Sequence, residues 1–329
     1  MKKRSLCITA AILLLLPSYS AFSQGLPEGD RRFAVVEFST NFMREEPEYE
    51  AENGDQALMG TVVEIIDEKS YWRRIVSPEP YTAWVNEMGL VEMDRAEAEA
   101  YIAAAKYICT ADFTHVFAVP DDGGERISDL VMGCLVRKKL DSRGNPVRRG
   151  KYLAVLLPSG KEGWVLKKKV SDFSEWTASR KMRAEDISEC AMRFLGVPYM
   201  WGGTSIKHVD CSGLSRSVFF MNGILLPRNA SQQAKVGEEV PMDRLEEGDL
   251  LFFGTPASAD RKERISHVGI YLGDSLYIHS SQVVRINSLN EEDENYGGRK
   301  PIRARRILGH VDDGNGIVSI SNSPYYFAQ

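Results

Sequence analysis

Cysteine and histidine are scarce in this chain of 329 residues, which contains five of each. No two cysteines form a Cys-x-x-Cys pair, so the structural zinc sites that such pairs build are not indicated. The chain also lacks a surplus of positive charge, because 41 basic residues are set against 46 acidic ones. Nucleic acid, which is bound mainly through its phosphates, is therefore not an expected partner.

Long apolar runs are absent apart from one near the N-terminus. Lys2-Lys3-Arg4 precedes a mostly apolar stretch over residues 6–17, and the small residues Ala21 and Ser23 follow. This order is typical of a secretory signal peptide, and the run is short for a membrane span. We therefore expect residues 1–23 to be a signal peptide, the protein to be periplasmic or secreted, and no stable membrane insertion.

An internal repeat with a spacing of 80 residues organises the N-terminal half. Residues 72–85 align without a gap on residues 152–165, and each copy is a strand-like run, a loop containing proline and a second strand at Trp-Val. Such a pattern predicts a small antiparallel barrel in each copy. The alanine-rich stretch between the two copies predicts a helical connector. The expected parts are barrels over residues 31–91 and 110–171, a connector over 92–109, and a further domain over 183–329.

Cys211 begins a helical pattern in this last domain. Leu214, Val218 and Met221 recur at helical spacing after it. A thiol at a helix N-terminus lies beside unpaired backbone N–H groups, which favour the thiolate and can stabilise an oxyanion. Gly269 leaves room for this helix end to approach. We therefore interpret Cys211 as a nucleophile.

His267 and His279 lie in two strand-like runs, residues 267–272 and 276–281. In both runs apolar residues alternate with the face that carries the histidine. A three-residue hairpin loop centred on Gly273 would place the two histidines directly opposite each other, with Cβ atoms about 4.5–5.5 Å apart. This spacing suits a catalytic base and a residue that orients it.

Other roles for these residues are open to the sequence. A zinc site made of Cys211, His267 and His279 is the alternative to the nucleophile, although no paired cysteines support it. Cys109 and Cys134 are the candidates for a disulfide in an exported protein, and the sequence does not decide whether they meet.

Six motifs in sequence order carry a resemblance to a known family. Between about Arg183 and Ile307 the chain closely resembles the NlpC-type cell-wall cysteine peptidases, a circularly permuted branch of the papain-like enzymes. The motifs are Phe194–Gly203, Asp-Cys-Ser-Gly at 210–213, Leu226–Arg228 with Ser231-Gln232-Gln233, Gly248–Phe253, Ser-His-Val-Gly-Ile-Tyr at 266–271, and Ile-His-Ser at 278–280.

The resemblance implies a role for each matching residue. Cys211 would be the nucleophile, His267 the base and His279 the orienting residue, while Tyr199 would lie near the oxyanion. The residues implied to line the substrate site are Trp201, Asp210, Ser212 and Ser231. No metal or organic cofactor is implied. The expected fold is a multidomain α+β protein, with two SH3-like β-barrels before a papain-like catalytic domain.

The two barrels add an expectation about the substrate. They resemble the bacterial SH3-like domains of endopeptidases that trim muropeptides with a free N-terminal L-Ala, in which the first barrel supplies an acid and a tyrosine to the ammonium group. Glu52 and Tyr81 are the predicted pair, and Glu46 is the alternative acid. A carboxylate there is a strong specificity device, because an acylated amine would leave it unpaired.

The sequence therefore predicts an exported cysteine peptidase, expected to be a monomer. Its partners would be peptidoglycan-derived peptides of the form L-Ala-γ-D-Glu-diamino acid, cut between γ-D-glutamate and the diamino acid. Two rivals stay open: a broader endopeptidase acting on intact murein, and a wall-binding protein whose catalytic domain is silent.

Overall fold

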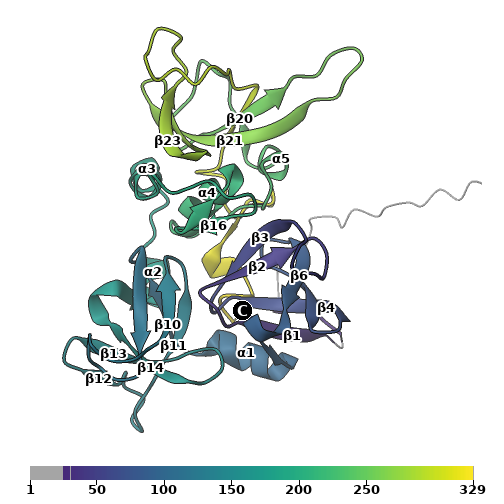
Figure 1. Cartoon of the computed structure of the whole chain (residues 1–329). Helices are drawn as coiled ribbons and strands as arrows, with labels where there is room; N and C mark the ends of the chain where they lie inside the picture. Colours follow the sequence, from purple (N-terminus) through teal and green to yellow (C-terminus); the bar gives the residue numbers. More distant parts are fainter. Residues whose placement is uncertain (1–24, 30, 329) are drawn as a thin grey trace, which may run out of the picture.

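The computed structural model describes residues 25–29 and 31–328, so the predicted signal peptide lies outside the described residues. Three parts follow one another along the chain, and Figure 1 shows the C-terminal sheet at one end of the molecule and the two N-terminal sheets at the other. Within the described residues, no helix is both long and apolar enough to span a bilayer.

The first part is an antiparallel sheet of seven strands in the order β3-β2-β6-β5-β4-β1-β7. Buried and more exposed residues alternate along β2 and β6, and one face of the sheet forms a core around Val63, Ile75 and Val85. The other face is buried at Phe33 and Val35 of β1. Its elements are β1 (Arg32–Val36), β2 (Thr40–Arg44), β3 (Asn53–Leu58), β4 (Val62–Lys69), β5 (Trp72–Val76), β6 (Thr82–Asn86), the 3-10 turn η1 (Glu87–Gly89) and β7 (Leu90–Met93).

The predicted connector is helical over only part of its length. Helix α1 (Arg95–Ala103) begins at a capping box in which Asp94 and Glu97 each bond the other's backbone N–H. The helix ends at Ala104, and Lys106–Cys109 forms strand β8 of the second sheet. The apolar side chains of this strand are buried between β11 and β15, which explains why the helix stops early.

The second part is an antiparallel sheet in the order β10-β9-β14-β13-β11-β8-β15, with β12 paired to β13. The repeat is visible in its register, because Ala154 lies opposite Trp164 as Arg74 lies opposite Trp84. Its further elements are β9 (Phe113–Phe117), β10 (Arg126–Val131), β11 (Leu135–Lys138), β12 (Arg148–Arg149), β13 (Tyr152–Leu156), β14 (Glu162–Leu166), η2 (Lys167–Lys169), β15 (Val170–Asp172) and the helix α2 (Phe173–Ala178).

The C-terminal part packs helices against a six-stranded antiparallel sheet, in the order β19-β24-β20-β21-β22-β23. Helix α4 lies against β21 and β22 of this sheet. The elements are α3 (Ala184–Met192), β16 (Thr204–Ser205), β17 (His208–Val209), α4 (Cys211–Phe220), β18 (Ile224–Leu225), α5 (Ala230–Gln233), β19 (Glu238–Glu239), β20 (Leu250–Thr255), β21 (Arg264–Gly273), β22 (Leu276–Ser281), β23 (Val283–Ser288), β24 (Arg303–Arg306), β25 (Val318–Ser319) and η3 (Ile320–Asn322).

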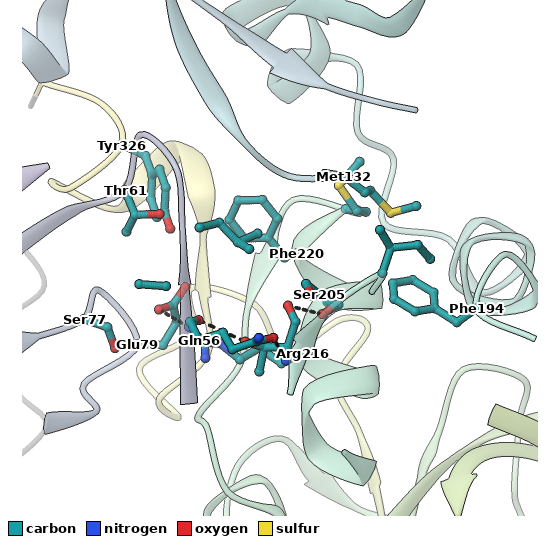
Figure 2. A pocket seen from close by; sticks show the side chains of 16 residues that line it. Gln56, Thr61, Ser77, Glu79, Met132, Phe194, Ser205, Arg216, Phe220 and Tyr326 are labelled. Carbon is teal, nitrogen blue, oxygen red and sulfur yellow. Dashed lines mark hydrogen bonds and ion pairs between the residues drawn. The ribbon is translucent and has the colours of Figure 1, made fainter. Parts of the chain in front are cut away.

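The end of the described chain packs into the junction of the three parts. Tyr326 is buried, and the ring of Phe327 stacks on that of Phe173 in α2 with centroids 5.0 Å apart. Beside Tyr326 lies a cavity of about 40 Å³, whose labelled lining residues in Figure 2 come from all three parts. Among the described residues, that lining includes Arg216 of α4 but neither Cys211 nor either histidine of the predicted site.

Candidate active site

The two histidines meet on neighbouring strands of the C-terminal sheet. His267 lies on β21 and His279 on β22, and Nε2 of His267 is 2.7 Å from Nδ1 of His279. His279 is buried, with 6% of its surface exposed. Burial lowers the pKa of both rings, that of His267 to about 3, because an imidazolium loses hydration in this site.

The predicted register of this hairpin is wrong. Ile270 pairs with Ile278 and Gly273 with Leu276, so Gly269, not His267, stands beside His279. Two causes account for the shift. The turn has only two residues, both at positive φ, and the pairing is irregular between Tyr271 and Gly273. The residues at positive φ are Asp274 and Ser275.

Gly269 makes room for a different neighbour than the sequence suggested. A Cβ atom on Gly269 would lie 2.9 Å from Cδ2 of Tyr277 and 3.3 Å from Cβ of His279. The glycine thus accommodates the adjacent strand, and the two histidine side chains meet diagonally across the hairpin.

Asn287 on β23 extends the histidine pair and was not found from the sequence. Its Oδ1 lies 2.7 Å from Nε2 of His279, and its Nδ2 donates to the carbonyl oxygen of Asn295 at 2.6 Å. A signal was present, because Val284 and Ile286 take the apolar face of β23 and leave Asn287 on the other face.

Cys211 is the first residue of α4, as the helical pattern predicted. The side chain of Asp210 caps this helix by accepting the N–H of Gly213 at 2.7 Å. Burial raises the pKa of the Cys211 thiol to about 11, and Asp210 adds to the rise, while the backbone N–H groups of Val268 and Ser212 lower it. The two backbone N–H groups lower the pKa of the thiol, as expected for a helix N-terminus, but the loss of hydration has the larger effect.

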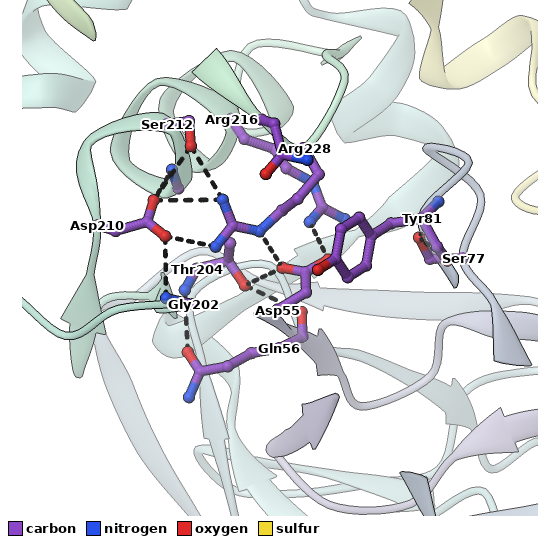
Figure 3. A network of polar contacts seen from close by, with 12 residues as sticks. Asp55, Gln56, Ser77, Tyr81, Gly202, Thr204, Asp210, Ser212, Arg216 and Arg228 are labelled. Carbon is purple, nitrogen blue, oxygen red and sulfur yellow. Dashed lines mark hydrogen bonds and ion pairs between the residues drawn. The ribbon is translucent and has the colours of Figure 1, made fainter. Parts of the chain in front are cut away.

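Asp210 and Ser212 flank the cysteine, but their side chains point into a buried polar network (Figure 3). Arg228 bonds both of them, with Nη2 2.5 Å from Oδ2 of Asp210 and Nη1 3.0 Å from Oγ of Ser212. Asp210 also accepts the N–H of Gly202 at 3.0 Å. Their predicted contact with substrate stays a prediction.

The same network reaches the first sheet through Asp55 on β3. The carboxylate of Asp55 forms an ion pair with Nε of Arg228 at 2.7 Å and another with Nη1 of Arg216 at 2.6 Å. Arg216 in turn pairs with Glu79 at 2.6 Å. The three carboxylates and two guanidinium groups are all largely buried, so the first sheet and α4 are joined by paired charges.

Tyr199 and Trp201 lie on the loop before α4. Burial raises the pKa of Tyr199 to about 12, and the charge of Cys211 is the next contribution, which places the phenol near the thiol. Trp201 is 61% exposed, and its backbone oxygen accepts from Nδ2 of Asn53 at 3.3 Å. This loop thus lies between the thiol and the first sheet.

Glu45, and neither the predicted Glu52 nor its alternative Glu46, is the acid that bonds Tyr81 in the structure, and the binding of substrate by Glu52 stays a prediction. The phenol of Tyr81 donates to Oε1 of Glu45 at 2.5 Å, and Glu45, Glu46 and Glu52 are all exposed residues. The β2–β3 pairing contains an irregularity next to Gly54, where a Cβ atom would lie 2.1 Å from both bonded oxygens. Glycine there opens the space in which the pair forms, which residue spacing alone does not reveal.

Ser231 is exposed on α5 and borders a different hollow. The described residues that line this hollow with it include Lys235, Arg264 and Arg305, but neither of the two bonded histidines. No cluster of three or more His, Cys, Asp or Glu side chains suited to a metal ion occurs in residues 25–29 and 31–328. Cys109, Cys134, Cys190 and Cys211 are free thiols.

A thiol at a helix N-terminus, packed against a strand that carries one of two bonded histidines, is an arrangement for nucleophilic catalysis. Residues 196–302 match the model of the NlpC/P60 family. A probable endopeptidase NlpC homolog from Haemophilus influenzae is 36% identical over 134 residues, which cover 40% of this chain and 67% of that protein. The chain belongs to the NlpC/P60 family.

Similarity also extends into the N-terminal half. A gamma-D-glutamyl-L-lysine dipeptidyl-peptidase from Bacillus cereus is 28% identical over 262 residues, covering 74% of each chain. The crystal structure of an NlpC/P60 family protein from Bacillus cereus superposes with a TM-score of 0.68 at 22% identity, over 84% of this chain and 99% of that one. The two proteins thus share a fold well beyond the C-terminal part.

Proposed function

We propose that the protein is a cysteine peptidase that hydrolyses the bond between γ-D-glutamate and the diamino acid in peptidoglycan stem peptides with a free N-terminal L-Ala. The bonded pair of His267 and His279 beside the Cys211 helix carries the proposal, because it supplies a nucleophile and a base. The name of the Bacillus cereus relative supports the choice of bond.

The chemistry starts from the neutral thiol of Cys211 and the neutral imidazole of His267. Nδ1 of His267 takes the thiol proton as the sulfur of Cys211 attacks the γ-carbonyl carbon. The resulting imidazolium gives this proton to the departing amine, which leaves a thioester on Cys211. Water, deprotonated by the same nitrogen, then hydrolyses the thioester and regenerates the thiol.

Tyr199 is assigned to the oxyanion that forms during both steps. Its raised pKa keeps the phenol protonated at neutral pH, so it can donate a hydrogen bond. Asp210 is assigned to hold the N-terminal end of α4, since its carboxylate already accepts hydrogen bonds from four residues of the protein: Gly202, Ser212, Gly213 and Arg228.

The two N-terminal parts are assigned as SH3-like barrels, before a papain-like catalytic domain. Their shared strand register and the overall likeness to the Bacillus cereus structure support this assignment. In this arrangement the first barrel presents Tyr81 toward the catalytic domain, because the charges of Asp55 and Arg228 act on its phenol.

The pair of Tyr81 and Glu45 is assigned to the ammonium group of L-Ala. An ammonium donates hydrogen bonds and carries positive charge, and this pair offers a carboxylate and a phenol oxygen in contact. Acetylation of the amine removes a charge-assisted bond worth roughly 1.5–3 kcal/mol, so hydrolysis should fall about tenfold or more.

The test compares free and N-acetylated L-Ala-γ-D-Glu-diamino acid peptides as substrates. Wild type should strongly prefer the free amine, and Glu45→Gln should lose most of this preference. Glu52→Gln is the matched control, because Glu52 belongs to the same hairpin and its backbone oxygen accepts the N–H of Glu45. Equal cleavage of both peptides by wild type would overturn the proposal and favour a broader murein endopeptidase.

Export is part of the proposal and rests on residues 1–23. Cells that express the full chain should release the mature protein to the periplasm or the medium, with an N-terminus near Gln24. Retention of an uncleaved chain in the cytoplasm would contradict this.

A further inference from the structure

The carbonyl oxygen of Asn295 determines how the side chain of Asn287 is oriented. A carbonyl only accepts hydrogen bonds, so the group of Asn287 that lies 2.6 Å away must be its amide nitrogen. The backbone N–H of Ser288 bonds the same carbonyl at 3.0 Å, and Ser288 is fully buried. The amide oxygen of Asn287 therefore faces His279.

The direction of the next two bonds follows from this orientation. The amide oxygen is an acceptor, so Nε2 of His279 must carry a proton to bond it at 2.7 Å. A neutral His279 then has its lone pair on Nδ1, which lies 2.7 Å from Nε2 of His267. Nε2 of His267 must donate this bond, and the lone pair of His267 is left on Nδ1, where a base is needed.

We propose that Asn287 is a positioning residue that fixes the tautomers of both histidines and so keeps Nδ1 of His267 free of a proton. Without the acceptor on Asn287, the proton of His279 can move to Nδ1 and donate to His267. The proton of His267 would then occupy Nδ1, and the base would be blocked.

Other groups around the pair do not replace Asn287 in this role. The rings of Tyr277 and Phe253 contact the two imidazoles through their faces and edges. Arg285 and Arg299 carry positive charge that lowers the pKa of His279, and neither supplies an acceptor. They favour neutral rings without choosing between tautomers.

The test uses Asn287→Leu, which keeps the size of the side chain and removes its acceptor, and Asn287→Asp, which retains an acceptor. Asn290→Leu is the matched control, because Asn290 bonds Asp293 in the same turn and makes no hydrogen bond to either histidine among the described contacts. Nitrogen-15 NMR of labelled histidines reports which nitrogen of each ring is protonated. The spectra of His267→Gln and His279→Gln assign the signals to the two rings.

Asn287→Leu should lower kcat about tenfold or more, as partial loss of a general base would, with KM nearly unchanged. Its NMR spectrum should show that the proton of His279 is found on Nδ1 as well as on Nε2. Asn287→Asp should restore most of kcat and move the acidic limb of the pH profile to higher pH, because a carboxylate stabilises the protonated pair. Asn290→Leu should resemble wild type in both measurements.

Unchanged tautomers in Asn287→Leu, or an Asn287→Asp variant as poor as Asn287→Leu, would overturn the inference. The inference rests on the proposed function only for its kinetic readout. If no peptide is hydrolysed by wild type, the proposed function fails, while the NMR spectra and the pH dependence of Cys211 alkylation still test the tautomers.

Discussion

At the scale of single residues, the state of Cys211 before reaction is decided by burial. The loss of hydration destabilises a thiolate more than the N–H groups at the start of α4 stabilise it, so the thiol is the favoured form. His267 is neutral for the same reason. We therefore expect the two groups to exist as a thiol and an imidazole that exchange a proton during attack, and not as a preformed ion pair.

This state predicts the pH dependence of alkylation. A thiol whose pKa is raised to about 11 is protonated at neutral pH. Its reaction with iodoacetamide should therefore accelerate about tenfold per pH unit between about pH 7 and pH 10. The Cys211→Ala variant serves as the control that measures alkylation of the three other described thiols. A plateau with a midpoint below about pH 7 would instead reveal a thiolate paired with an imidazolium.

Substitution of the three catalytic candidates should give graded losses. Cys211→Ala should abolish hydrolysis while the fold is kept, because no other group can form the thioester. His267→Ala should cost roughly 10²–10⁴ in kcat as the loss of a general base, and His279→Ala less, since it orients the base. Residual turnover by Cys211→Ala above a few per cent, or equal histidine losses with metal dependence, would contradict these roles.

At the scale of elements, buried charges hold the first sheet against α4. Asp55 of β3 lies between Arg216 and Arg228, and Arg228 also holds the aspartate that caps α4. Removing one partner of such a set leaves the others buried without their counter-charge, which is far more costly than the loss of a surface ion pair.

Asp55→Ala should therefore destabilise the protein strongly. We expect the free energy of unfolding, measured by urea titration, to fall by about 3–5 kcal/mol. Glu291→Ala, which removes the exposed ion pair with Lys300, is the control and should leave the free energy of unfolding nearly unchanged. Similar small losses in both variants would show that the network adds nothing to the contact between the parts.

The elements were predictable from the sequence wherever a period or a repeat marks them. The 80-residue repeat reappears as two hairpins of equal register, β5–β6 and β13–β14, and α4 starts at Cys211 as its apolar spacing indicated. The details that the sequence did not predict depend on single irregularities in strand pairing. A two-residue turn with a bulge places Gly269, two residues after His267, beside His279, and the irregular pairing next to Gly54 lies where Glu45 bonds Tyr81.

Hydrogen-bond and ion-pair partners that are distant in sequence could not be predicted from the sequence pattern either. Asn287 lies opposite Tyr277 on the paired strand and reaches His279 through its side chain. Asp55 meets Arg228 only because two parts of the chain dock. Nothing in residue spacing encodes docking. The resemblance to a family located the cysteine and histidines, whereas the hydrogen-bond partners that orient them came from the geometry.

At the scale of the whole molecule, the first part and the C-terminal part both border the proposed substrate site. The loop of Tyr199 and Trp201 runs between Cys211 and the first sheet, and Tyr81 of that sheet approaches the network of Arg228. A peptide with its carbonyl at Cys211 and its amine at Glu45 would span the two parts. This arrangement limits the substrate at its N-terminal end, which agrees with the proposed need for a free amine.

The most direct test is product analysis by mass spectrometry on the free tetrapeptide L-Ala-γ-D-Glu-diamino acid-D-Ala and on intact murein, with Cys211→Ala as the control. We predict release of L-Ala-γ-D-Glu from the free tetrapeptide, incorporation of one solvent oxygen into the new γ-carboxylate, and no release from murein whose L-Ala is acylated. Loss of D-Ala alone, or release of fragments from intact murein without cleavage of the free tetrapeptide, would contradict the account.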